Sequence, residues 1–366
     1  MGAAVAAAAA VTAAAGPREE GLMEYRLLGL SGTAVSALAL GTLTFGNETS
    51  EAGSFAQLDR FVSAGGTLID TADVYADGRS EQIIGRWLAT RADARERAVV
   101  ATKGRFPTTG DPNGLGLSRR HLAAALDASL RRLGVEAIDL YQLHGWDPLT
   151  PVEETLRFLD DAAQAGKIGY FGLSNFLGYQ VQKYVDLADR HGLIRPVTVQ
   201  PQYNLLARAI EWEVGPACQA EGLGLLPWSP LASGWLTGKY RRGEPPATGT
   251  RLSDQMDQGM RIWNERGHLE RNWQVTETVR KVAEGRGASM SQVAIAWVLA
   301  RPAVRSVILG ARTLAQLDDN LAAGDLDLSE DETRLLDEAS DPGAPDYPYG
   351  ERGQTQRDRR ISGGRF

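Results

Sequence analysis

Short runs of apolar residues alternate along the chain with longer segments in which apolar positions recur every three or four residues. Most of the runs are uniformly apolar and do not alternate with polar residues. That pattern is typical of parallel strands that are buried on both faces. The runs predict strands at residues 35–41, 67–70, 98–102, 138–143, 168–173, 197–199, 222–226 and 306–309.

The intervening segments predict amphipathic helices. A stripe of leucines between residues 122 and 133 is preceded by Ser118, a candidate N-cap, and followed by Gly134, where a helix can end. Thr150 and Pro151 predict a capping box with proline at the first helical position. Further helices are predicted from Ser80 onward, near residues 273–284 and at residues 291–300.

Strand–helix repeats of roughly 30–40 residues favour a closed (β/α)8 TIM barrel of the α/β class. The alternative is an open doubly wound sheet, which usually carries a glycine-rich turn after its first strand. No G-x-G-x-x-G follows a predicted strand, and no P-loop pattern is present. Residues 25–33 predict a strand and turn that pair with the following run, giving an N-terminal β-hairpin. Extra C-terminal helices complete the expected fold.

The two ends differ in composition from the rest of the chain. Residues 1–22 are mostly alanine and glycine, and their apolar stretch is too short to span a membrane and follows no basic segment. We therefore expect a disordered tail, or an upstream start with Met23 as the working start. Residues 23–341 are expected to form the barrel, and residues 342–366 a second tail rich in Gly, Pro and Arg.

The composition limits the kinds of partner that we expect for this protein. The chain has 366 residues and a net charge of −7, which argues against a nucleic-acid partner. The single cysteine, Cys218, cannot form an intramolecular disulfide and fits a reducing compartment. The four histidines are scattered without zinc spacing, so no metal site is expected. We therefore expect a cytoplasmic protein with no membrane partner; the pattern gives no indication of its oligomeric state.

Polar or aromatic residues follow every predicted strand except the first. In (β/α)8 barrels the active site lies at the carboxyl ends of the strands, where the loops gather. We therefore expect one site built from these residues. In chain order they are Asp70, Thr71, Asp73, Tyr75, Lys103, His144, Ser174, Asn175, Gln200, Trp228, Ser229, Gly310 and Arg312.

Four of these residues, Asp70, Tyr75, Lys103 and His144, suit proton delivery to a carbonyl oxygen. A tyrosine is a poor acid near neutral pH unless its phenolate is stabilised, and a nearby lysine ammonium favours the phenolate. An aspartate can hold that lysine charged, and a neutral histidine can orient the substrate oxygen. Taken singly, the four also suit a helix cap, a rim aromatic, a solvated strand end and a core histidine. Their common location at strand ends favours catalysis.

A set of motifs resembles the aldo-keto reductase superfamily, in family-like order and spacing from about Met23 to Asp341. M-E-Y-R-L-L-G-L-S-G near the start also resembles the family. The others are I-D-T-A-D-V-Y (69–75), V-V-A-T-K (99–103), L-Y-Q-L-H (140–144), G-L-S-N-F (172–176), Q-P-Q-Y-N (200–204), P-W-S-P-L-A-S-G-W-L-T-G-K-Y (227–240) and V-I-L-G-A-R-T-L-A-Q-L-D-D-N-L (307–321).

This resemblance implies a barrel that binds NADP(H) without a Rossmann domain, with Tyr75 as the proton donor and Asp70, Lys103 and His144 completing the catalytic set. It places Ser174, Asn175 and Gln200 at the nicotinamide carboxamide and Trp228 against the nicotinamide ring. For the rest of the cofactor the resemblance implies contacts with Thr42, Asp70, Ser229, Leu231, Ser233, Lys239, Arg251, Gly310, Arg312, Gln316, Asp319 and Asn320.

The expected reaction is reduction of a small-molecule aldehyde or ketone to the alcohol. Tyr75 and His144, with Phe106 and Trp146, are the expected substrate contacts, and Trp235 and the loop at residues 252–273 are expected to shape the pocket. One alternative is a binding or redox-sensing protein like the potassium-channel β subunits, in which asparagine typically replaces the histidine. Another is a keto-sugar reductase. His144 favours an enzyme over the channel subunit.

Overall fold

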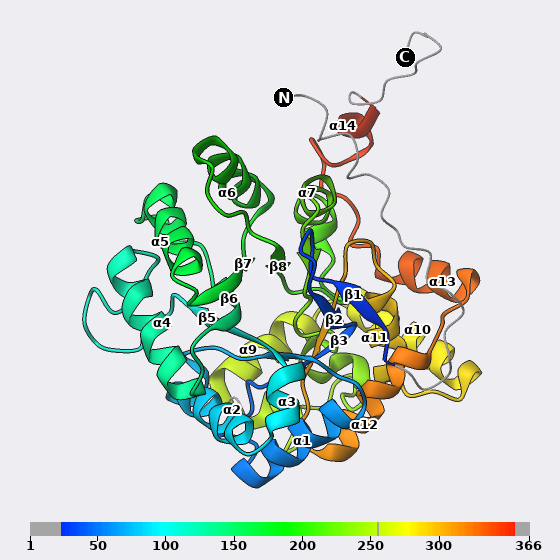
Figure 1. Ribbon diagram of the computed structural model, residues 1–366. Coiled ribbons are helices and arrows are strands. Elements are labelled where there is room, and N and C mark those ends of the chain that lie inside the picture. The colour runs from blue at the N-terminus through cyan, green and yellow to red at the C-terminus, as the bar shows by residue number, and fades with distance from the viewer. Residues whose placement is uncertain (1–22, 255, 356–366) are drawn as a thin grey trace.

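An eight-stranded parallel sheet forms the centre of the computed structural model, which describes residues 23–254 and 256–355 (Figure 1). From β3 to β9 each barrel strand pairs with the next one along the chain, and β10 pairs with β3. The strands are β3 (Leu38–Gly41), β4 (Leu68–Asp70), β5 (Val99–Gly104), β6 (Ile138–Leu143), β7 (Ile168–Ser174), β8 (Thr198–Gln200), β9 (Gly224–Leu225) and β10 (Val307–Leu309).

The sheet closes between β9 and the segment that leads into β10. The backbone N–H of Leu225 donates to the carbonyl of Ala303 at 2.7 Å, and that of Arg305 donates to the carbonyl of Leu225 at 2.9 Å. Since a closed sheet has no free edge, these bonds exclude the open doubly wound alternative. The predicted (β/α)8 barrel is confirmed.

The N-terminal hairpin is also confirmed, but the first apolar run is divided between two sheets. β1 (Tyr25–Leu27) pairs antiparallel with β2 (Ala34–Ser36), and Ala37 then separates β2 from barrel strand β3. The prediction of one strand at residues 35–41 was therefore wrong. Both halves are buried, so apolarity alone did not mark the break. Leu28, in the hairpin loop, packs into the interior core of the barrel.

Helices surround the strands, and most of them bury apolar residues in the core between helices and sheet (Figure 1). In chain order they are α1 (Glu51–Ser63), α2 (Arg79–Ala89), α3 (Ala92–Arg97), α4 (Arg119–Leu133), α5 (Val152–Gln164), α6 (Gly178–His191), α7 (Val214–Glu221), α8 (Arg251–Asp254), α9 (Met256–Gly267), α10 (Glu270–Arg286), α11 (Met290–Leu299), α12 (Leu314–Leu321), α13 (Glu330–Ser340) and α14 (Glu351–Thr355).

The two predicted helix starts had different outcomes. The Ser118 hydroxyl accepts a hydrogen bond from the His121 N–H at the start of α4, so the predicted N-cap is confirmed. The capping box at Thr150 was wrong, because Thr150 Oγ1 donates to Asp147 Oδ2 at 2.6 Å instead. Pro151 is the N-cap of α5 and forms no side-chain cap.

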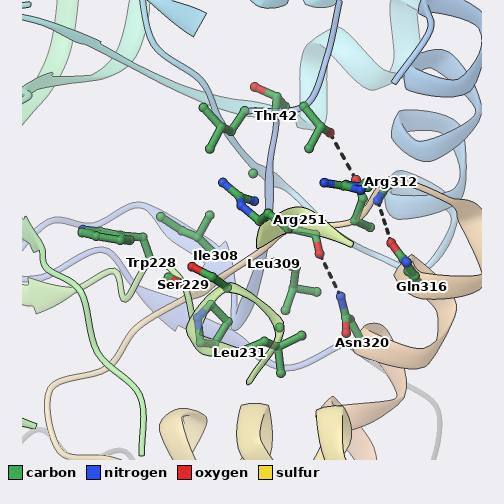
Figure 2. Close-up of a pocket in the computed structure, with 18 of the residues that line it drawn as sticks. Thr42, Trp228, Ser229, Leu231, Arg251, Ile308, Leu309, Arg312, Gln316 and Asn320 are labelled. Atoms are coloured by element: carbon green, nitrogen blue, oxygen red, sulfur yellow. Dashed lines mark hydrogen bonds between the residues drawn. The ribbon is translucent and has the colours of Figure 1, made fainter. Parts of the chain in front are cut away.

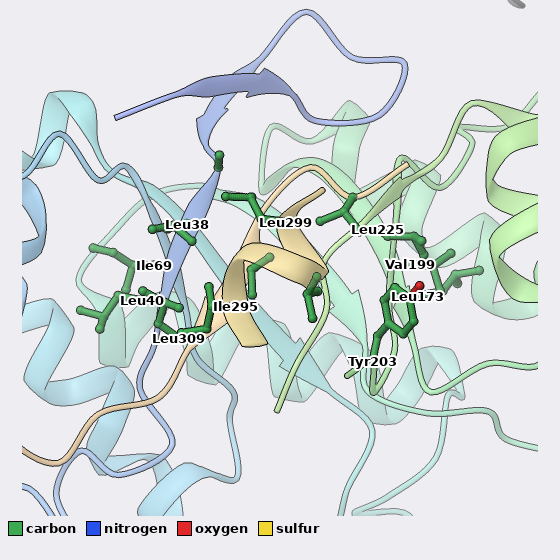
Figure 3. Packing of buried hydrophobic residues seen from close by; sticks show 14 of the residues in the cluster. Leu38, Leu40, Ile69, Leu173, Val199, Tyr203, Leu225, Ile295, Leu299 and Leu309 are labelled. Carbon is green, nitrogen blue, oxygen red and sulfur yellow. The ribbon is translucent and has the colours of Figure 1, made fainter. Parts of the chain in front are cut away.

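Side chains on the strands divide into two packing layers. In β3, Leu38 and Leu40 pack with the helices, whereas Ala39 faces the barrel interior. Figure 3 shows Leu38 and Leu40 near Ile295 of α11, which belongs to the same core. None of the helices in the described part of the chain is long and apolar enough to cross a membrane.

Candidate active site

A cavity of about 560 Å³ opens where the carboxyl ends of the barrel strands meet. Every residue that the sequence predicted to bind the cofactor lines it, from Thr42 on the first barrel loop to Asn320 on α12. Tyr75 and His144 line the same cavity, and Lys103 is fully buried beside Tyr75. Tertiary structure therefore brings the predicted cofactor and catalytic residues into one place.

Lys103 lies at the centre of the predicted proton-delivery set. Its Nζ lies 2.6 Å from Asp70 Oδ2 and 3.4 Å from the Tyr75 hydroxyl, and it also donates to the Thr71 carbonyl at 2.7 Å. The register explains the contact, because β4 and β5 are neighbours with Asp70 opposite Ala101. Lys103 is two residues beyond Ala101 and therefore points to the same face as Ala101.

The Asp70 carboxylate accepts hydrogen bonds from three side chains. Besides Lys103, Gln142 Nε2 donates to Oδ1 at 3.1 Å and Gln200 Nε2 donates at 2.8 Å. Gln142 was not among the predicted site residues, although it lies two residues before His144 and therefore on the same strand face. Gln200, predicted to hold the nicotinamide carboxamide, directs its amide N–H to Asp70.

The charges of this set depend on burial. Burial opposes the Lys103 ammonium, but Asp70 and Tyr75 outweigh that effect, and the pKa of Lys103 is raised. Burial also raises the pKa of Tyr75, and Asp70 adds to this rise, whereas Lys103 lowers it. Lys103 therefore lowers the pKa of Tyr75, as predicted, but by less than burial raises it, because a phenolate is poorly solvated in this interior.

His144 is neutral at physiological pH. Its burial, together with the nearby charges of Lys103 and Arg105, lowers its pKa to about 2. The imidazole lies edge-on to the Tyr75 ring, with 6.0 Å between the ring centroids. Its Nδ1 atom is buried without a hydrogen-bond partner in the described residues. A neutral ring beside the Tyr75 hydroxyl fits the predicted role of orienting a substrate oxygen.

The predicted substrate and pocket aromatics divide into two groups. Phe106 packs edge-on against His144 with 4.7 Å between ring centroids, although it does not itself line the cavity. Trp146 packs instead against Phe176 and Tyr184 and does not line the cavity. Trp235 is fully buried and stacks on Trp263 of α9. Neither tryptophan lines the cavity, and both pack in aromatic clusters; their predicted roles at the substrate stay predictions.

Three residues in the middle of the cavity have an unusual backbone conformation. Asn175, Ser229 and Ser233 all lie in the left-handed region, with φ of 62°, 56° and 60°. Trp228 Nε1 donates to Asn175 Oδ1 at 3.1 Å, and Asn175 Nδ2 donates to the His144 carbonyl at 3.0 Å. Such conformations cost energy and gather at ligand sites, so this arrangement marks a binding surface.

Arg312 lies at the far end of the cavity (Figure 2), and it has two carboxylate partners. Its Nε lies 2.5 Å from Glu48 Oε2, and its Nη1 lies 2.9 Å from Asp254 Oδ2. Its Nη2 is buried and has no partner in the described residues. Gln316 Oε1 accepts from the Arg312 backbone N–H at 2.9 Å, as Figure 2 shows. Neither carboxylate was among the predicted site residues, because both come from distant parts of the chain.

Two further cations, Lys239 and Arg251, line the same part of the cavity as Arg312. Burial lowers the pKa of Lys239, and the charges of Arg312 and Arg251 lower it further. Cations that repel one another around a cavity are suited to an anion with several phosphate groups. The donor set therefore fits a phosphate-bearing cofactor.

Comparison with known proteins agrees with this geometry. Residues 37–341 match the model of the aldo/keto reductase family. The chain is 36% identical to an uncharacterised oxidoreductase of Bacillus subtilis, over 86% of this chain and 95% of that protein. It is 38% identical to a probable voltage-gated potassium channel subunit beta of Oryza sativa, over 83% and 92%. It is 34% identical to the versiconal hemiacetal acetate reductase of Aspergillus parasiticus, over 88% and 98%.

Proposed function

Since the chain belongs to the aldo/keto reductase family, we propose that it is an NADP(H)-dependent oxidoreductase that reduces aldehydes or ketones to alcohols. The observation that carries the proposal is the buried Lys103 ammonium, which bridges Asp70 at 2.6 Å and the Tyr75 hydroxyl at 3.4 Å. Such a bridge at the wall of a cavity supports acid catalysis on a bound carbonyl. The test is oxidation of NADPH with a generic aldehyde.

In the proposed reaction, Tyr75 donates its hydroxyl proton to the carbonyl oxygen. Lys103 stabilises the phenolate that remains, and Asp70 keeps the lysine protonated. Neutral His144 hydrogen-bonds the carbonyl oxygen and orients it toward the tyrosine. NADPH bound in the cavity would supply the hydride for the carbonyl carbon.

The cavity offers distinct contacts for each part of the cofactor. Trp228 would lie against the nicotinamide ring, with Asn175 hydrogen-bonding beside it. Lys239, Arg251 and Arg312 would hold the phosphates. A guanidinium binds a phosphate with paired hydrogen bonds, and Arg312 Nη2 has no hydrogen-bond partner in the described part of the chain.

We expect NADPH to bind more tightly than NADH, by about tenfold or more, because one hydrogen bond to a charged group contributes about 1.5–3 kcal/mol. Arg312→Ala should shrink this preference by weakening NADPH binding and sparing NADH. Added salt should weaken NADPH more than NADH. The measurement is the dissociation constant of each cofactor at two ionic strengths.

The control for this prediction is Arg334→Ala, which removes an exposed arginine that pairs with Asp331 on α13. It should leave both dissociation constants unchanged. Equal losses for NADPH and NADH in Arg312→Ala would mean that Arg312 only ties Glu48 to Asp254. In that case the phosphate assignment would be withdrawn.

A binding or redox-sensing role is the second candidate, favoured by the 38% identity to the probable channel subunit of Oryza sativa. Tight NADPH binding without measurable turnover on any aldehyde or ketone would support that role. Steady turnover would support the enzyme. The neutral His144 beside Tyr75 favours turnover.

A further inference from the structure

A second polar cluster lies on the other side of the barrel wall from Lys103. In β5 the side chains alternate, so Thr102 points away from Lys103 and toward the surrounding helices. Thr102 Oγ1 donates to Glu81 of α2 at 2.5 Å, and Arg132 of α4 donates to the other Glu81 oxygen at 2.6 Å. The Glu81 carboxylate is fully buried and satisfied.

Asp73 adds a second carboxyl to this cluster. It is 2% exposed, and no side-chain donor among the described residues reaches either of its oxygens. The hydroxyl of Tyr141, on neighbouring β6, is buried without a hydrogen-bond partner among those residues. A buried carboxyl with no side-chain donor is costly in its ionised form and much less costly when protonated.

Asp73 is linked to both ends of the Lys103–Tyr75 contact. Its backbone N–H donates to the Lys103 carbonyl at 3.1 Å, and Tyr75 follows two residues later. Arg132 packs against Gly78, which ends the turn that begins at Tyr75: a Cβ at Gly78 would lie 2.8 Å from Arg132 Cδ. A change of charge at Asp73 therefore acts on the segment that carries the proposed proton donor.

Titratable groups on α2, α4, β5 and β6 surround the Asp73 carboxyl. Burial raises the pKa of Asp73 to about 7, and Glu81 adds to the rise, whereas Arg132, the backbone N–H of Val74 and Lys103 lower it. The raised pKa of Tyr141 keeps its hydroxyl protonated. His144 stays neutral through this range, since its pKa is about 2. Of Asp73, Tyr141 and His144, Asp73 is thus the one that changes charge near neutral pH.

We propose that Asp73 is a positioning residue for the proton transfer, and that its ionisation slows carbonyl reduction by placing a second negative charge behind Lys103. The inference rests on the proposed function. A carboxylate there holds the ammonium more tightly and makes the Tyr75 hydroxyl a weaker acid. Reduction is therefore favoured when Asp73 is protonated, and oxidation of the alcohol when it is ionised.

The first test is the pH dependence of kcat for aldehyde reduction at saturating NADPH. The wild-type kcat should fall on the order of two- to fivefold as the pH rises through about 7, the size expected for one screened charge. Asp73→Asn, which keeps the shape and removes the titrating proton, should abolish this step. Asp73→Glu should restore it. Asp139→Asn, which removes a carboxyl that accepts from the Val100 N–H, should leave it unchanged.

The second test measures thermal stability against pH and does not depend on turnover. The pKa of Asp73 is raised from 3.8 to about 7 in the folded protein, so its contribution to stability is complete below 3.8 and is lost as the pH rises through 7. The wild type should therefore lose melting temperature relative to Asp73→Asn between these values. A constant difference would overturn the proposal.

The outcomes separate this inference from the proposed function. If neither the wild type nor Asp73→Asn oxidises NADPH with any carbonyl substrate, the proposed function fails. If both turn over and show the same step near neutral pH, the assignment of Asp73 alone fails. Loss of the step in Asp73→Asn, together with the stability shift, would establish it.

Discussion

Replacing Tyr75 with phenylalanine is expected to lower kcat for carbonyl reduction by about a hundredfold or more, the usual cost of losing a general acid. The ring would still pack against His144, but Lys103 would lose its contact with the phenolic oxygen. NADPH binding should stay near normal, because the cavity keeps its phosphate and ring contacts. Stopped-flow turnover and NADPH fluorescence titration measure the two quantities.

Tyr179→Phe is the matched control, since Tyr179 lies on α6, is 61% exposed and does not line the cavity. It should leave kcat unchanged. An undiminished kcat in Tyr75→Phe would exclude Tyr75 as the proton donor. A parallel loss of NADPH binding would mean that the hydroxyl organises the cavity instead.

Replacing Lys103 with methionine should both stop catalysis and destabilise the fold. The side chain is fully buried, and its removal leaves the Asp70 carboxylate without its cation. Removing one partner of a buried ion pair typically costs about 3–5 kcal/mol. Gln142 and Gln200 still donate to Asp70, so the lower end of this range is expected. Denaturant unfolding and kcat provide the two readouts.

The double variant Lys103→Met with Asp70→Leu separates the two effects. It removes the uncompensated charge, so it should recover part of the lost stability while remaining inactive. If Lys103→Met unfolds at the same denaturant concentration as the wild type, the ion pair contributes nothing to stability. Retained activity in either variant would contradict the proposed role of Lys103.

The order of strands and the location of the site followed from local pattern. Uniformly apolar runs identified buried parallel strands, and the polar residues directly after them identified the active end of the barrel. Asp70, Lys103 and His144 could be found in this way because each stands at the end of a strand, and in a closed parallel barrel these ends converge. The strand positions and the alternation of side chains were therefore enough to predict that these residues lie close together.

The sequence did not determine which face a residue would occupy or what it would meet. The apolar run at residues 35–41 divides at Ala37, and Trp146 and Trp235 entered aromatic cores. In each case the apolar residues are packed against others, as their character indicated, but the residues that they pack against come from elsewhere in the chain.

Charge partners were decided by tertiary structure alone. Glu48 and Asp254 both precede Arg312 by many residues in the sequence, yet both pair with it, and Gln142 adds a third side-chain donor to Asp70. Asp73 stands three residues from Asp70, yet its carboxyl lies near Glu81 and Arg132 and has no side-chain donor in the described residues. Burial and long-range contacts set the energy of a charge. Sequence spacing therefore located these groups, and the packing of distant elements determined their protonation and their roles.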